Sequence, residues 1–261
     1  MGFGWGIFGA SFATVLAQLI AFLLCLRSLR RLPFVQLTKA DWKTDPAILL
    51  HLCRLGIPTG LQMSMITLGG MVLQSVLNGF GVVFVAGYTA ANKLYGILES
   101  ASVAFGYAMT AYMGQNRGAR IDAGIRAVLA LSAGFTAAIV TAMLLAGKPL
   151  LGLFLSTEEA GAADALAVAH RYLMVLMAFL LALFVLQAYR SSLQGLGEMT
   201  VPTLSGFAEM LMRMGAALVL PAFIGQSGVF FAEGAAWVCA AALNLVWYYM
   251  RIGKIKREMM Q

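Results

Sequence analysis

Long apolar runs recur along this sequence and constrain its fold more than any other feature. Most reach the roughly 20 residues that an α-helix needs to cross the hydrocarbon core of a bilayer. Hydrophobic residues make up 61% of the 261 and charged residues 11%, whereas a soluble chain carries about 25% charged residues. The surplus apolar surface must face lipid, so we predict an all-α integral membrane protein with about seven transmembrane helices. The expected spans are 5–26, 56–78, 83–113, 122–146, 167–194, 201–223 and 229–250.

The basic residues stand at the ends of these apolar runs. They are concentrated in residues 27–55, 117–126 and 251–257, and the turns 79–82 and 224–228 contain none. Such clustering is the topology signal of a membrane protein, so the net charge of +7 does not indicate a nucleic-acid partner. Because cytoplasmic loops carry the excess of Lys and Arg, we expect the N-terminus outside and the C-terminus in the cytoplasm.

Three features mark where helices begin. The first apolar run extends from Trp5 to Leu26 without a basic leader, which indicates a transmembrane helix rather than a signal peptide with its ~7–15-residue apolar core. Asp45-Pro46 is typical of an N-cap followed by proline, and predicts a short interfacial helix before the second span. Pro58 is expected to open that second span, where its missing N–H is tolerated.

The first and last helices resemble each other. Gly6-Ile7-Phe8 and Gly228-Val229-Phe230 each precede a small-residue run and, farther on, a basic cluster. Chance similarity between glycine- and alanine-rich helices is the alternative. A true repeat makes the first helix the end of a preceding lobe and the other six a complete lobe, as in transporters built from repeats. The predicted organisation is then a last helix of a missing lobe (1–30), a basic linker with an interfacial helix (31–55) and a six-helix lobe (56–261).

Signatures of enzymes are absent from the sequence, including HExxH, GxSxG and the nucleotide-binding P-loop. We therefore expect no enzymatic activity, no cofactor and no metal site. Cys25, Cys53 and Cys239 stand far apart and suit apolar packing.

Ionisable residues within the apolar runs are the strongest functional candidates, because a charge at the bilayer centre costs at least ~2.5–3.5 kcal/mol. Glu209 and Arg213 are spaced i,i+4 and can neutralise each other on one helix face. Lys93 and Glu99 lie about 120° apart around an ideal helix. Glu99 therefore needs another helix, a cation or a proton as its partner. Glu233 lies near the outer end of the last span.

Neutral polar residues accompany these charges within the spans. Hydrogen bonds between helices are one explanation for them, and a polar binding cavity is the other. The candidate substrate- or ion-binding residues are Glu99, Lys93, Tyr95, Asn92, Gln62, Gln187 and Asn244.

Three segments resemble the multidrug and toxic compound extrusion (MATE) family. Residues 87–119, GYTAANKLYGILESASVAFGYAMTAYMGQNRGA, resemble its eighth helix and the cytoplasmic exit of that helix. Pro58 in LGIPTGLQ matches the proline of the seventh helix, and RSSLQGLGEMTVPTLSGFAEMLMR (190–213) is similar to a linker and the eleventh helix. The structural motif residues are Pro58, Gly114, Gln115, Asn116, Gly118, Glu209 and Arg213. By this resemblance, the chain corresponds to helices six to twelve of a MATE family protein.

The resemblance implies a cation-coupled antiporter of the bacterial inner membrane. Such a protein exports drugs or organic cations against H⁺ or Na⁺ by alternating access, and this chain supplies its C-terminal part. Its partners are then the bilayer, a small-molecule substrate, and either the missing N-terminal lobe or a second copy. Segments 56–78 and 171–189 contain no Asp or Glu, unlike the branch of the family with acidic residues on its seventh and tenth helices.

Two other functions are compatible with such a chain. A flippase of lipid-linked saccharides shares the superfamily architecture, and several cationic residues in its cavity would favour it; Lys93 is the obvious candidate. A seven-helix receptor shares the topology, but a retinal-binding one needs a lysine in its last helix, and 229–250 has none.

Overall fold

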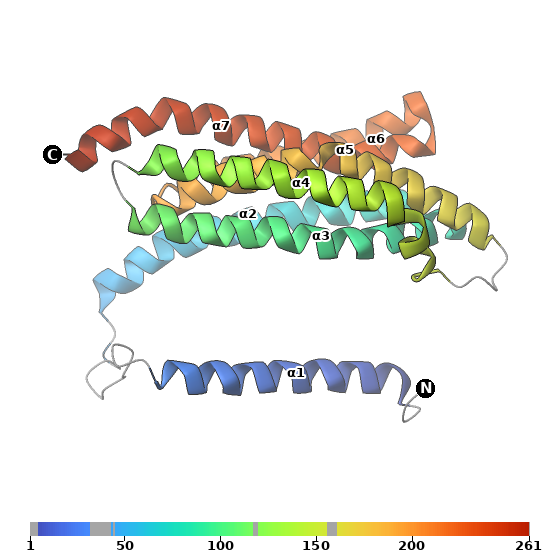
Figure 1. The fold of residues 1–261 in the computed structure, drawn as a ribbon, viewed down its shortest axis with the longest axis horizontal. Helices are drawn as coiled ribbons and strands as arrows, with labels where there is room; N and C mark the ends of the chain where they lie inside the picture. Colours follow the sequence, from blue (N-terminus) through green and yellow to red (C-terminus); the bar gives the residue numbers. More distant parts are fainter. Residues whose placement is uncertain (1–4, 32–42, 44, 117–119, 156–160, 261) are drawn as a thin grey trace. The chain divides into compact units, whose positions relative to one another are not determined.

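The computed structural model describes residues 5–31, 43, 45–116, 120–155 and 161–260. These residues form helices and connecting turns and contain no strand, which confirms the all-α prediction (Figure 1). The helices are α1 (Gly6–Leu29), α2 (Pro46–Asn78), α3 (Val82–Gln115), α4 (Ile121–Gly152), α5 (Ala162–Gly195), α6 (Thr200–Ile224) and α7 (Phe231–Met260), with a 3₁₀ turn, η3 (Gln226–Phe230), before α7.

Among the described helices, six are long and apolar enough to cross a membrane: α1, α2, α4, α5, α6 and α7 with its 3₁₀ turn. The exception is α3, although it has 34 residues. The polar residues that interrupt α3, Lys93 and Glu99 among them, lower its hydropathy. The helix that falls short of the hydropathy needed for a membrane span, α3, therefore also holds the candidate site residues Lys93 and Glu99.

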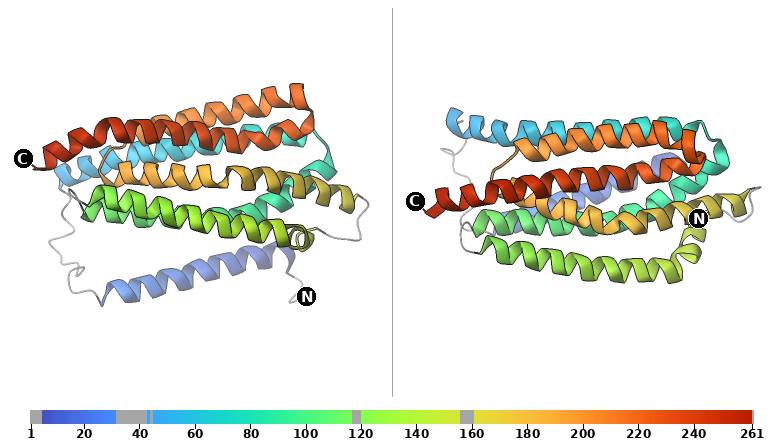
Figure 2. Two further views of the ribbon diagram at one scale, coloured as in Figure 1. Left: turned by 45° about the horizontal axis from the view of Figure 1, so that its top comes forward. Right: turned by 90° about the horizontal axis from the view of Figure 1, so that it is seen from above.

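The chain divides into two compact units, residues 1–52 and 53–261. The first holds α1 and the first turns of α2. The second holds the rest of α2 and the helices α3 to α7, which run side by side in Figures 1 and 2. Within this unit α5 is central, since it packs against α3, α4, α6 and α7 and buries residues along its whole length.

The start of α2 agrees in part with the sequence prediction. Asp45 caps the helix, because its Oδ1 accepts a hydrogen bond of 2.8 Å from the Ala47 N–H. The prediction of a separate interfacial helix was wrong, because one helix continues from Pro46 to Asn78. The prediction that Pro58 opens the second span was also wrong, because Pro58 lies inside this helix. A proline removes one backbone hydrogen bond and bends a helix without having to end it. The Pro58 carbonyl also accepts a hydrogen bond from the Thr203 hydroxyl (3.2 Å), which ties α2 to α6.

Candidate functional site

A cavity of about 480 Å³ lies among α2, α3, α5, α6 and α7. Its apolar lining includes Met63, Ile66, Leu183 and Trp237. Its charged lining comes from four different helices: Glu99 on α3, Arg190 on α5, Glu209 and Arg213 on α6, and Glu233 on α7.

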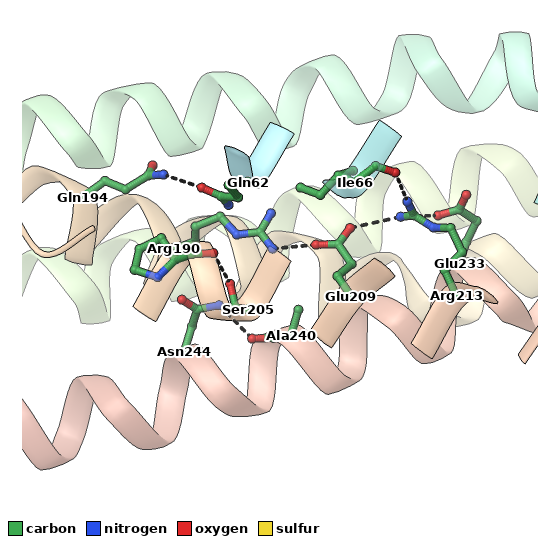
Figure 3. A network of polar contacts seen from close by, with 11 residues as sticks. Gln62, Ile66, Arg190, Gln194, Ser205, Glu209, Arg213, Glu233, Ala240 and Asn244 are labelled. Atoms are coloured by element: carbon green, nitrogen blue, oxygen red, sulfur yellow. Dashed lines mark hydrogen bonds and ion pairs between the residues drawn. The ribbon is translucent and has the colours of Figure 1, made fainter. Parts of the chain in front are cut away.

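Four of these charged residues form a ladder of alternating sign, which Figure 3 shows. Arg190 Nη2 lies 2.5 Å from Glu209 Oε2, and Arg213 Nη2 lies 3.0 Å from Glu209 Oε1. The same Arg213 Nη2 is 2.9 Å from Glu233 Oε2. We call Arg190, Glu209, Arg213 and Glu233 the ionic ladder. The pairing of Glu209 with Arg213 that their spacing predicts is present, and the structure adds one partner at each end.

Burial makes this pairing necessary. The side chains of Arg190, Glu209 and Arg213 are 7%, 4% and 6% exposed, and that of Glu233 is 16% exposed. Isolated charges with so little water cost several kcal/mol each, and close opposite charges offset that cost. The ladder also joins helices, because Arg213 Nη1 donates a hydrogen bond of 2.9 Å to the Ile66 carbonyl of α2. One arginine therefore contacts α2, α6 and α7.

Glu99 has a different environment from the other two carboxylates. It is half-buried, and its carboxylate interacts with the Tyr95 hydroxyl one helical turn away. Within the described part of the chain, the salt bridges of the cavity involve Glu209 and Glu233, and none involves Glu99. Glu99 also lines a second, more open hollow of about 400 Å³ beside α3. Among the described residues, it is therefore the cavity carboxylate that has no arginine partner.

Aromatic rings form one wall between α3 and α7. Tyr95 stacks on Trp237 with ring centroids 5.5 Å apart and an interplanar angle of 25°. Tyr107 also lines the cavity, and 74% of its surface is exposed. Aromatic faces attract cations with an energy of about 0.5–2 kcal/mol, so this wall suits a positively charged ligand.

The structure brings together four of the seven binding candidates. Glu99, Tyr95, Asn92 and Gln187 all line the cavity. Gln62 is fully buried just behind it, and its Oε1 accepts a hydrogen bond of 3.1 Å from Gln194, which lines the cavity.

The other two candidates lie elsewhere. Lys93 is exposed on α3 and is not among the residues that line either hollow. Asn244 is buried, and its Nδ2 donates a hydrogen bond of 2.8 Å to the Ala240 carbonyl of its own helix.

Sequence reasoning missed Arg190 and Trp237 as site residues. Arg190 falls within the predicted span 167–194, so the rule that charges inside an apolar run mark functional positions could have found it. Trp237 follows Glu233 by four residues and therefore shares a face of α7 with it. Glu233 was noticed as a charge within a span, but its partnership with Arg213 depends on how α6 and α7 pack.

The motif at the end of α3 lies apart from the cavity. Gly114 and Gln115 complete the helix, and Asn116 caps it, because both its backbone N–H and its Nδ2 donate to the Tyr112 carbonyl (2.9 and 3.1 Å). Gly118 lies outside the described residues.

No group of three or more His, Cys, Asp or Glu that could hold a metal ion occurs among the residues that the structure describes.

Comparisons with known proteins agree with this architecture. The MatE family model matches residues 58–219. The chain is 31% identical over 265 residues to the probable multidrug resistance protein YpnP and 27% identical over 264 residues to YoeA, both from Bacillus subtilis. In each case 97% of this chain matches 56% of the relative, so the chain spans little more than half the length of these relatives.

Solved structures share the fold. The chain is similar to a MOP superfamily transporter from Pyrococcus furiosus with a TM-score of 0.86 and 23% identity. It is also similar to an outward-facing multidrug resistance MATE family transporter, with a TM-score of 0.85 and 23% identity. Each alignment covers 97% of this chain and 58% of the other. This chain therefore belongs to the MatE family, the multidrug and toxic compound extrusion transporters.

Proposed function

We propose that this chain is the C-terminal lobe of a cation-coupled antiporter that exports drugs or organic cations. The lobe works by alternating access with an N-terminal lobe or with a second copy of itself, and H⁺ or Na⁺ drives the exchange. Two observations support the proposal: relatives named as probable multidrug resistance proteins are nearly twice as long, and a cavity with charged side chains lies among α2, α3, α5, α6 and α7 of this chain.

The charge of the cavity lining carries the argument. Three carboxylates (Glu99, Glu209 and Glu233) face two guanidinium groups (Arg190 and Arg213). The formal net charge of these five lining residues is thus −1. Glu99 is the carboxylate that lies outside the ionic ladder. A half-buried carboxylate in a membrane protein needs a proton, a metal cation or a cationic ligand to balance it.

This count argues against a flippase of lipid-linked saccharides. A lipid-linked saccharide is an anionic cargo, and its binding would need basic groups in the cavity that no carboxylate neutralises. Arg190 and Arg213 are both held by carboxylates, and Lys93 does not line the cavity.

Replacement of Glu99 tests the proposal. In the complete transporter, Glu99→Gln removes the exchangeable charge, so drug resistance of the host cell should fall toward that of cells without the transporter. The measurement is the minimum inhibitory concentration of cationic drugs at equal expression. The matched control is Asp164→Asn, since Asp164 is exposed in the first turn of α5, away from the cavity. Full resistance in the Glu99→Gln variant would contradict the proposed role of Glu99.

We also propose an N-terminus outside and a cytoplasmic C-terminus in the bacterial inner membrane. The basic clusters at 27–55, 117–126 and 251–257 support this orientation. Two reporters fused after Gln261 test this orientation. A reporter that works only in the cytoplasm should give a signal, and a reporter that works only in the periplasm should give none. The reverse pattern would show the opposite orientation.

A further inference from the structure

The three cavity carboxylates differ in how many arginines hold them. Glu209 is held from both sides, by Arg190 and Arg213. Glu233 has one ion pair within the described chain, to Arg213, and Glu99 has none. Arg213 is therefore the residue that decides whether the cavity offers one free carboxylate or two.

The two carboxylates in question flank the aromatic wall. Glu99 follows Tyr95 by one turn on α3, and Glu233 precedes Trp237 by one turn on α7. Tyr95 and Trp237 are themselves stacked at 5.5 Å. A ligand that lies along this wall thus has one carboxylate on the α3 side and one on the α7 side, and Arg213 neutralises the second.

We propose that Arg213 determines the valence of the cargo: by neutralising Glu233 it makes the lobe select cations with one positive charge over cations with two. The proposal rests on the function proposed above and adds a specificity residue to it. Charges interact strongly where water is scarce, so a second cationic centre near Glu233 would be placed beside the Arg213 guanidinium and repelled. Without Arg213, the same position would hold an uncompensated carboxylate.

A series of charge variants in the purified full chain tests this. The formal charge of the five lining residues is −1 in the native chain, −2 in Arg213→Gln, 0 in Glu233→Gln and −1 again in the double variant. Arg213→Lys keeps the positive charge but not the forked geometry. The probes are tetraphenylphosphonium, a monocation, and decamethonium, a dication. Their dissociation constants are measured by equilibrium dialysis at pH 8, where a carboxylate that has lost its arginine is most readily ionised.

The native chain should bind the monocation more tightly than the dication. In Arg213→Gln the ratio of the two affinities should shift toward the dication by about tenfold, as one added unit charge at low dielectric implies. The double variant and Arg213→Lys should both return the ratio to the native value. Glu233→Gln should weaken monocation binding by about tenfold, because it removes the excess negative charge.

The outcomes separate the two proposals. Failure of the native chain to bind either probe would overturn the proposed function and this inference with it. Binding with an unchanged ratio in Arg213→Gln would overturn the inference alone, and so would a shift that persists in the double variant, since shape rather than charge would then be its cause. Where Arg213→Gln does not fold, the double variant is compared with Glu233→Gln: tighter monocation binding in the double variant supports the inference, and equal binding overturns it.

Discussion

Glu209 is the residue on which the ionic ladder depends. It accepts contacts from Arg190 and from Arg213, whereas Arg213 has a second carboxylate partner in Glu233. The loss of Glu209 therefore leaves Arg190 without an ion pair among the described residues, at 6% exposure. The loss of Arg190 leaves Glu209 still paired with Arg213. The two ends of one salt bridge are thus not equivalent.

We expect Glu209→Gln to destabilise the chain by about 3 kcal/mol or more, the range for a buried pair that has lost one partner. Arg190→Gln should cost less, because its carboxylate partner stays compensated. The measurement is unfolding of the purified chain in detergent, by heat or by increasing denaturing surfactant. An equal or larger loss of stability in Arg190→Gln would show that the Arg190–Glu209 pair acts alone, without support from Arg213.

At the scale of helices, close approach of α3 to α5 builds one side of the lobe. Gly87 makes this approach possible: a Cβ atom there would collide with the Ala165 carbonyl oxygen of α5 and lie 2.9 Å from Val168 Cβ. Nearby, Tyr88 and Tyr172 stack with centroids 4.5 Å apart, and their hydroxyls are 3.2 Å apart. Gly96, on the same helix, has no atom within 4 Å of the corresponding position.

Gly87→Ala should therefore destabilise the lobe by about 1–2 kcal/mol, as overpacking against a neighbouring backbone outweighs the gain in helix propensity. Gly96→Ala is the matched control, and should be neutral or stabilise by up to ~1 kcal/mol. Both are measured as shifts of the unfolding midpoint in detergent. Equal shifts would mean that α3 and α5 are not held at the separation described.

At the scale of the whole molecule, the chain matches 56% of the length of its relatives. The alternating access that we propose requires two walls that move relative to each other around the cargo, and in this proposal the helices around the cavity form one of them. The proposal therefore predicts that transport depends on a second wall, from an N-terminal lobe or from a second copy of this chain.

We expect the purified chain as a monomer in proteoliposomes to show no proton- or sodium-driven efflux of a fluorescent cationic drug. When the N-terminal lobe of a relative such as YpnP is reconstituted together with this chain, we expect drug efflux to occur. Transport by a dimer of this chain would identify a second copy as the partner. Robust transport by the monomer would be incompatible with a role as one lobe.

The sequence by itself determined seven long helices, because span length and apolar composition are local properties that neighbouring elements cannot reverse. Six of the described helices are also apolar enough to cross a membrane, and α3 is the exception. It also determined the Glu209–Arg213 pair, since residues four apart on one helix must share a face. Only the tertiary structure decided that Arg190 and Glu233 extend this pair while Glu99 remains outside it. Which side chains meet across helices depends on the rotation and packing of α3, α5, α6 and α7 about their axes, and no spacing within a single helix fixes those rotations. The same dependence explains why Lys93 and Asn244, as polar as Asn92 and Gln187, lie away from the cavity.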